Sequence, residues 1–179
     1  MSAITAHLTV EQFLALPEDP SVRQELLGGE LVTMGRGGVK HEIVKSNFGQ
    51  ELGAYFQQNR IGRVMSESTF RITEHDAPMP DVSVVLAGRL PKEGEGLMAI
   101  VPDIAIEVVS SEPAAVLRAK IKLYLDHGAK AVWVAYPKLR IIEVHDGSGV
   151  RELSGERLLE TPGVLPGFSV PASAFFREI

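Results

Sequence analysis

Apolar side chains recur at every third or fourth position in two stretches of the chain, which is the spacing of one helical face. In the first stretch, residues 40–59, the apolar positions are Val44, Phe48, Leu52, Tyr55 and Phe56. In the second, residues 113–128, they are Leu117, Ile121, Tyr124 and Leu125. The pattern predicts two amphipathic helices. We expect Ser110 or Ser111 to cap the second, because a hydroxyl can accept a hydrogen bond from an unpaired N–H of the first turn.

Around these helices, short runs rich in Val, Ile and Phe predict strands. They are "GRVMSE", "TFRITE", "DVSVVLA", residues 101–109, "AKAVWVAY", "LRIIEVHD" and "VREL", and an earlier pair flanks Gly28-Gly29. The run "AKAVWVAY" is apolar throughout, which is typical of a central strand covered on both faces. The hairpins and the single strand–helix–strand crossover predict an α/β fold with a central mixed sheet flanked by helices. We expect a single domain over residues 1–179.

Composition narrows the chemistry that the chain can perform. The sequence has no cysteine, which excludes disulfides, thiolate metal sites and cysteine nucleophiles. Its formal net charge of −5 argues against broad, non-specific coating of nucleic acid. No apolar run is long enough to span a bilayer, and the amino terminus lacks a signal-peptide pattern, so we expect a cytoplasmic protein without a membrane partner.

Glu107 lies in the middle of the apolar run "VPDIAIEVVSS". In a strand, Asp103, Ala105, Glu107 and Val109 share one face, so a half-buried strand with this face in water is one interpretation. The other is a metal site, which requires a second carboxylate close by, because Mg²⁺ takes oxygen ligands at about 2.1 Å. Asp103 is about 13 Å away along the strand, too far to share an ion. The partner must therefore come from another strand.

Asp81, at the start of the preceding predicted strand "DVSVVLA", is the candidate partner. It comes close to Glu107 if the two strands are neighbours. A cation is also needed to steady an attacking water or the developing charge. Lys120 lies on the flank of the predicted helical stripe, whereas Lys122 points toward solvent. A lysine at such a border often only extends its ammonium to water. Because this helix directly follows the Glu107 strand, Lys120 is nevertheless a candidate for the site.

The order Asp81, then Glu107-Val108-Val109, then Lys120 resembles the PD-(D/E)XK nuclease superfamily, in some members of which the lysine has moved to the neighbouring helix. The segments "LTVEQFLALPED", "QELLGGELV", "MPDVSVV", "PDIAIEVVSS", "KIKLYLDHGAKAVWVAYP" and "LPGFSVP" resemble, in this order, the Uma-type restriction endonucleases of bacteria. The likeness covers nearly the whole chain. Most members of that family have no known function.

The resemblance implies a restriction-endonuclease-like fold and a homodimer. It also implies that Asp81, Glu107 and the Val108 carbonyl bind Mg²⁺ or Mn²⁺, that Lys120 is the catalytic cation, and that Glu25 and His41 support the site. The chain departs from the family pattern at Gln24, at Gly29 and in "GRGGVKHE", which replaces a loop rich in Pro and Ser. These departures touch the entrance of the expected site and leave its substrate preference open.

Two hypotheses remain for the function. The first is a metal-dependent DNA endonuclease that hydrolyses phosphodiester bonds, with Asp81, Glu107 and Lys120 as catalytic residues. The second is a catalytically inactive module of the same fold that binds nucleic acid or a protein partner. The basic, glycine-rich stretch with Arg36, Lys40 and Lys45 suits a phosphate contact, although a solvated loop is the simpler interpretation.

Overall fold

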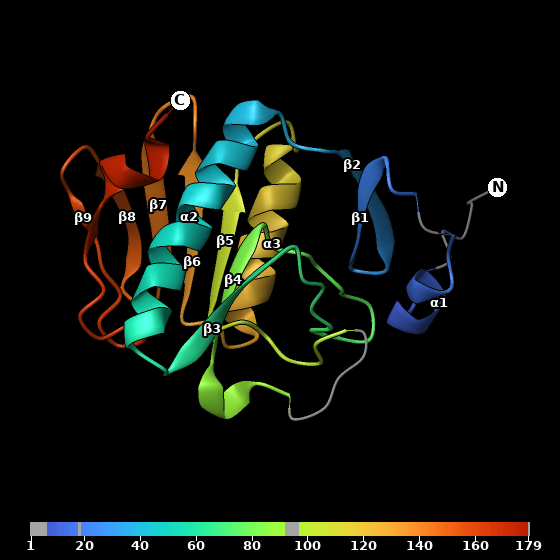
Figure 1. The fold of residues 1–179 in the computed structure, drawn as a ribbon. Coiled ribbons are helices and arrows are strands. Elements are labelled where there is room, and N and C mark those ends of the chain that lie inside the picture. The colour runs from blue at the N-terminus through green and yellow to red at the C-terminus, as the bar shows by residue number, and fades with distance from the viewer. Residues whose placement is uncertain (1–6, 18, 92–96, 179) are drawn as a thin grey trace.

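A six-stranded sheet forms the centre of the protein, in the order β3-β4-β5-β6-β7-β8 (Figure 1). The computed structural model describes residues 7–17, 19–91 and 97–178. The strands of this sheet are β3 (Gly62–Ser66), β4 (Val82–Leu86), β5 (Ile104–Val108), β6 (Ala131–Tyr136), β7 (Ile141–Asp146) and β8 (Gly149–Ser154). Neighbours run antiparallel except for β5 and β6, which are parallel. The predicted α/β fold with a central mixed sheet is confirmed.

Helices cover both faces of the sheet (Figure 1). α2 (Val39–Gln58) packs on the face that includes Ile104 and Ile106, and its range agrees with the prediction. α3 (Ala114–Asp126) connects the parallel strands β5 and β6 and packs on the opposite face, against Ala105. Strand β5 is buried at every position. The interpretation of β5 as a half-buried strand with its polar face in water is therefore wrong.

An amino-terminal lobe lies beside one end of the sheet, at the right of Figure 1. It consists of α1 (Val10–Leu14) and the hairpin of β1 (Val22–Leu27) and β2 (Glu30–Gly35). The hairpin turns at Gly28 and Gly29, whose φ angles are 57° and 78°, in the region that favours glycine. Leu26 of β1 pairs with Ala77 and packs with Val10. This contact fixes β1 against the loop that leads into β4.

The predicted strand over residues 69–74 does not form. Phe70 makes only an isolated bridge with Met98, and the Ile72 N–H donates to the Asp76 carbonyl within a local turn. The alternation that suggested a strand arises because Phe70 is buried while Ile72 packs against the cluster under α3. A loop can bury alternate side chains without a ladder of hydrogen bonds, so the pattern was misleading here.

The predicted N-cap of α3 is also wrong. The helix begins after Pro113, which is its N-cap residue and has extended backbone. The residue before a proline is disfavoured in helical conformation, so Glu112 cannot belong to the first turn. Ser110 and Ser111 consequently lie outside the helix and line a pocket instead. The helix ends at Asp126, near the end of the predicted stretch, and Gly128 follows with a φ of 101°, in the region that favours glycine.

The carboxy-terminal part closes over the α2 face. It contains β9 (Leu158–Leu159), β10 (Val170–Pro171) and the 3₁₀ helix η2 (Ala172–Phe176). Elsewhere in the chain, a short 3₁₀ helix, η1 (Ala87–Arg89), follows β4. Phe175 of η2 stacks on Phe48 of α2, with ring centroids 4.2 Å apart. Of the helices in the described ranges, none has the length and apolar character needed to cross a bilayer.

Candidate functional site

Pairing of β4 with β5 brings the first two predicted residues together. Val82 is opposite Ile106 and Ser83 is opposite Ala105, so the next step of the same antiparallel register puts Asp81 opposite Glu107. The Val108 N–H donates to Asp81 Oδ2 at 2.7 Å, which ties Asp81 to the end of β5. Both carboxylates lie on the α3 side of the sheet, because side chains alternate along a strand.

Helix α3 supplies the cation and a second donor. The Lys120 ammonium donates to Glu107 Oε2 at 2.8 Å, and one turn later the Tyr124 hydroxyl donates to Glu107 Oε1 at 3.0 Å. Lys120 and Tyr124 are four residues apart and therefore share a helical face. Lys122 points away, with a side chain that is 76% exposed and paired with Asp126. The structure thus brings Lys120 into the site and leaves Lys122 outside it.

Strand β1 contributes two further charges from the amino-terminal lobe. Arg23 and Glu25 are two residues apart on β1 and face the same way. Arg23 Nη1 donates to Asp81 Oδ1 at 2.5 Å, and Arg23 Nη2 lies 2.8 Å from Glu25 Oε1. Glu25 also accepts from the Lys120 ammonium at 3.1 Å. Because both β1 side chains reach residues on the sheet and α3, the lobe closes the site from one side.

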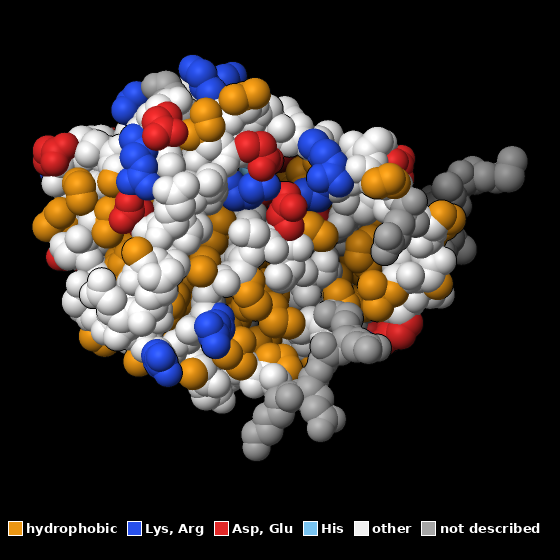
Figure 2. All heavy atoms as spheres, viewed as in Figure 1, with side chains coloured by type: hydrophobic (Ala, Val, Ile, Leu, Met, Phe, Trp, Pro, Cys, Tyr) orange, Lys and Arg blue, Asp and Glu red, His pale blue; other side chains and the backbone are white. Residues whose placement is uncertain are grey.

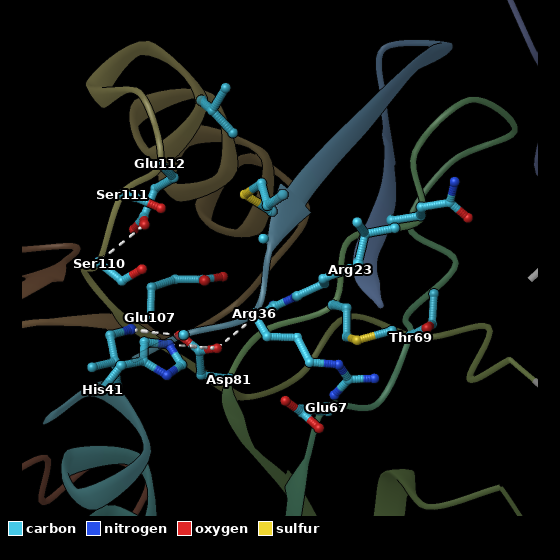
Figure 3. A pocket seen from close by; sticks show the side chains of 18 of the residues that line it. Arg23, Arg36, His41, Glu67, Thr69, Asp81, Glu107, Ser110, Ser111 and Glu112 are labelled. Carbon is cyan, nitrogen blue, oxygen red and sulfur yellow. Dashed lines mark hydrogen bonds and ion pairs between the residues drawn. The ribbon is translucent and has the colours of Figure 1, made fainter. Parts of the chain in front are cut away.

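His41, in the first turn of α2, approaches Asp81 from the other side. His41 Nε2 lies 3.3 Å from Asp81 Oδ1, and His41 Nδ1 lies 3.2 Å from Glu42 Oε1. A Cβ atom on Gly37 would lie 2.2 Å from the His41 ring, so only glycine allows this approach. The glycine in the unusual "GRGGVKHE" segment therefore helps to place His41. Figure 3 shows Arg23, His41 and Asp81 meeting beside Glu107.

The cluster is buried and rich in negative charge. Glu25, Asp81, Glu107 and Lys120 are each at most 3% exposed. Among these described side chains, three carboxylates face the two permanent cations Arg23 and Lys120, which leaves one formal negative charge when His41 is neutral. Burying an unbalanced charge is costly, so a cluster of this kind is typical of a functional site rather than of a structural core.

The pKa shifts follow from burial and from these neighbours. Burial, against the opposing effect of Lys120, raises the pKa of Glu107, and the charges of Asp81 and Glu25 add to the rise. Burial would also raise the pKa of Asp81, but His41 and Arg23 outweigh it and hold that pKa well below its usual range. Burial opposes the charged forms of His41 and Lys120, yet the facing carboxylates raise the pKa of both. The two acids that face each other across the strands thus differ strongly in proton affinity.

A pocket of about 440 Å³ opens above the cluster. Asp81, Glu107 and Lys120 lie in it together with Arg23 and His41. One part of its wall is apolar, with contributions from Phe13, Leu14, Leu16, Met34, Val116 and Leu117. Ser110, Ser111 and Glu112, labelled in Figure 3, line the part between β5 and α3. A small ligand or a short segment of a larger one can therefore reach the buried charges.

The donor set has the chemistry that suits Mg²⁺ or Mn²⁺, since carboxylate and carbonyl oxygens are the ligands that hard divalent cations prefer. Three buried atoms of the site also lack hydrogen-bond partners among the described residues: Glu25 Oε2, Arg23 Nε and Arg23 Nη2. In the described ranges, however, no three His, Cys, Asp or Glu side chains form a group that could hold a metal. The oxygens of Asp81 and Glu107 accept from protein donors instead. The residue types fit a divalent cation, and the arrangement requires at least one donor to withdraw.

Sequence reasoning missed two members of the site. Tyr124 was assigned to the apolar stripe of α3, although its hydroxyl group distinguishes it from the neighbouring Leu and Ile residues. Arg23 was not considered, although its spacing from Glu25 puts both on one strand face. In the basic stretch, Arg36 lines the pocket and donates to the Pro20 carbonyl, and Lys45 pairs with Glu42 and Glu67.

Comparison with known proteins agrees with the architecture. One solved structure, a putative nuclease belonging to DUF820 from Anabaena variabilis, superposes with a TM-score of 0.84 and covers 94% of this chain and 97% of that one. At 23% sequence identity, this match shows the shared fold. No curated protein matches the chain. The Uma2 family model, described as a putative restriction endonuclease, matches residues 10–173, which span every element of the site. The chain therefore belongs to the Uma2 family, as its motifs predicted.

Proposed function

We propose that the protein is a DNA endonuclease that hydrolyses phosphodiester bonds with Mg²⁺ or Mn²⁺. One observation carries the proposal: the β4–β5 register puts Asp81 opposite Glu107, and the Lys120 ammonium donates to Glu107 at 2.8 Å inside a pocket. This is the set of two acids and one lysine that the family resemblance implies. Membership in the Uma2 family supports the same reaction class.

The residues of the chain have distinct roles in this proposal. Asp81, Glu107 and the Val108 carbonyl would hold the cation at the ends of β4 and β5. A bound divalent cation would supply a water of lowered pKa and neutralise charge on the scissile phosphate. Lys120 orients the attacking water and stabilises the negative charge that develops in the transition state. Its burial strengthens this effect, because few solvent dipoles screen the ammonium.

Glu25 and His41 act as positioning residues. Glu25 accepts from Lys120 at 3.1 Å and, together with Glu107, restrains the ammonium. His41 approaches Asp81 at 3.3 Å and fixes the orientation of that carboxylate. Supporting contacts of this kind matter because a displacement of about 1 Å at a reacting group lowers the rate strongly.

The surface suggests how DNA would be held. On the face shown in Figure 2, Lys and Arg side chains lie interspersed with Asp and Glu, and the described residues there form no broad basic patch. Binding through many phosphate contacts would require such a patch. Together with the formal net charge of −5, this leads us to infer that recognition is concentrated at the pocket, which a short segment of the DNA strand enters. The affinity should consequently depend only weakly on salt concentration.

The protein would act as a homodimer. The family resemblance implies this assembly, and two sites related by a two-fold axis suit the two strands of a duplex. Light scattering at micromolar protein concentration tests it, with twice the monomer mass of 19.4 kDa as the expected result. A mass of one chain under these conditions would contradict the dimer and leave the chemistry of the site to be tested separately.

A second candidate function is binding without catalysis. It is favoured by the donors that already satisfy the acids: Asp81 accepts from Arg23 and the Val108 N–H, and Glu107 accepts from Lys120 and Tyr124. In this case the pocket would bind nucleic acid or a protein partner while the charged cluster remained closed. Retained oligonucleotide binding with no cleavage in any divalent cation would favour this function.

A plasmid-nicking assay separates the two functions. Purified protein is incubated with supercoiled plasmid in Mg²⁺, in Mn²⁺ and in EDTA, beside a Glu107→Gln variant whose folding is checked by circular dichroism. We expect nicking by the wild-type protein in either metal, and none in EDTA or by the variant. Nicking that persists in EDTA, or equally in the variant, would rule out this site as its source.

A further inference from the structure

Arg23 occupies a central place among the acids of the site. Its guanidinium group contacts Asp81 at 2.5 Å and Glu25 at 2.8 Å, and the side chain is only 14% exposed. It reaches this place from β1, which belongs to the amino-terminal lobe rather than to the sheet. Arg23 and Asp81 are 58 residues apart in the chain, so the contact depends on how the hairpin docks.

The arginine is only partly satisfied by hydrogen bonds. Nη2 lies near Glu25 but is not aligned for a hydrogen bond, and Nε has no partner among the described residues. Buried guanidinium groups normally use their forked donors fully, since each unpaired buried donor costs stability. The strong contact is therefore the single one from Nη1 to Asp81 Oδ1, and few other bonds hold Arg23 in place.

We propose that Arg23 is the resident cation of the metal-free site and that a divalent metal displaces it from Asp81. The inference rests on the proposed function, because it takes Asp81 as a metal ligand. It adds a role for a residue outside the implied nuclease set. Arg23 compensates the acids until metal binds, and so sets how much metal is needed to load the site.

The occupancy of Asp81 supports displacement. Its Oδ2 accepts from the Val108 N–H, a bond that belongs to the β4–β5 junction. Its Oδ1 faces both Arg23 and His41. A dication at Asp81 must use an oxygen that protein donors now occupy, and it would repel a guanidinium group within contact distance. Arg23 can withdraw from Asp81 and keep its ion pair with Glu25, whereas the Val108 N–H is fixed in the backbone.

The first test follows the arginine directly by NMR. The Nε–H resonance of Arg23 is assigned by its absence from an Arg23→Lys variant and is followed while Mg²⁺ is added. The matched control is Arg89, which pairs at 2.7 Å with another buried acid, Asp103, and does not line the pocket. We expect the Arg23 signal to shift with the same midpoint as Mg²⁺ binding measured by calorimetry, while the Arg89 signal stays. An unchanged Arg23 signal at saturating Mg²⁺ would overturn the inference.

The second test measures Mn²⁺ affinity by calorimetry in folded variants. Arg23→Gln should bind Mn²⁺ about tenfold or more tightly than the wild type, a normal size for the coupling between two ligands of one site. The Mn²⁺ affinity of Arg23→Lys, which retains the charge, should stay within about threefold of that of the wild type. The affinity of the control variant Arg89→Gln should equal that of the wild type. Mn²⁺ binding that is detected in Arg23→Gln but not in the wild type would also support the inference. Equal affinity in Arg23→Gln and wild type, or equally tight binding by Arg23→Lys and Arg23→Gln, would overturn it.

Failure of the inference can be distinguished from failure of the proposed function. Suppose that the wild type binds Mn²⁺, that Asp81→Asn does not, and that Arg23→Gln has the same affinity as the wild type. The metal site is then supported, and the proposed role of Arg23 is wrong. If neither the wild type nor Arg23→Gln binds Mn²⁺ or Mg²⁺, the metal-dependent function falls, and the displacement of Arg23 falls with it.

Discussion

The two ends of β5 each bury an acid that pairs with a cation, yet only one end has the features of a functional site. Asp103, just before the strand, is 1% exposed, accepts from the Leu86 N–H at 2.8 Å and pairs with Arg89 at 2.7 Å. Glu107, near the other end on the same face, is 3% exposed and pairs with Lys120 at 2.8 Å. Burial of an acid with a cationic partner therefore does not identify a site.

Charge balance and access separate the two ends. At Asp103, one carboxylate meets one arginine and one backbone donor, which satisfies a structural link between β4, η1 and β5. At Glu107, three carboxylates share two permanent cations, and these charges come from the lobe, the sheet and α3. A pocket also reaches the Glu107 end. An excess of buried charge that can be reached from solvent is the useful signal.

The largest effect should come from exchanging the two aspartates for asparagine. Asp81→Asn should reduce metal-dependent nicking to the level seen in EDTA, because a proposed ligand loses its charge. Asp103→Asn should retain cleavage. Asp103→Asn should lose roughly 1–3 kcal/mol of unfolding free energy, since it leaves Arg89 without its carboxylate partner, whereas Asp81→Asn should lose less, since Arg23 keeps its ion pair with Glu25. Urea melts and nicking time courses measure the two quantities. Loss of cleavage in both variants at equal stability would erase the distinction between the two ends.

The two lysines of α3 provide the next contrast. Lys120→Met should lower the nicking rate by about 10²-fold or more, the scale of losing one preorganised electrostatic contact. Lys122→Met should leave the rate unchanged, because its ammonium lies on the surface with Asp126. Single-turnover nicking rates test this, with circular dichroism as the check on folding. A slow Lys122→Met variant beside a fast Lys120→Met variant would reassign the catalytic lysine.

Two tyrosine-to-phenylalanine changes compare a hydrogen bond to a buried glutamate with one to a more exposed glutamate. Tyr124→Phe removes the donor at 3.0 Å from buried Glu107 Oε1 and should cost about 1–2 kcal/mol. Tyr136→Phe removes the donor at 3.1 Å from the more exposed Glu143 and should cost less than about 0.5 kcal/mol. Denaturant melts of both variants measure the difference. Equal costs would mean that the Glu107 carboxylate does not depend on its hydroxyl partner.

The smallest effect concerns pH. The pKa of His41 is raised in the folded protein, mainly because Asp81 and Glu42 outweigh burial. A raised pKa means that protonated His41 stabilises the fold fully below the unfolded value of 6.5, and that this contribution is lost as pH rises through the folded pKa. The stability advantage of the wild type over His41→Gln should therefore shrink as the pH rises above 6.5 and through the folded pKa of His41. An advantage that is constant or grows with pH would show that Asp81 does not stabilise the charged ring.

Much of the fold was predictable because local periodicity reports local burial. The spacing of apolar residues marked α2 and α3, the apolar run "AKAVWVAY" marked β6, and Gly28-Gly29 marked the first hairpin. The same reasoning failed over residues 69–74 because a loop also buries alternate side chains. It failed at the start of α3 because Pro113 restricts the residue before it, which outweighs the preference of serine for a capping position.

The sequence alone determined which elements form and that Asp81, Glu107 and Lys120 deserved consideration, since an acid in an apolar strand and a lysine beside an apolar stripe are unusual in their own segments. Only the tertiary structure decided that these residues meet, and that Arg23 and Tyr124 join them. Residues 95 positions apart, such as Glu25 and Lys120, come into contact at 3.1 Å. That contact depends on the docking of the β1–β2 hairpin through Leu26 and Ala77. No local period encodes it, because the free energy of docking is spread over side chains from separate segments.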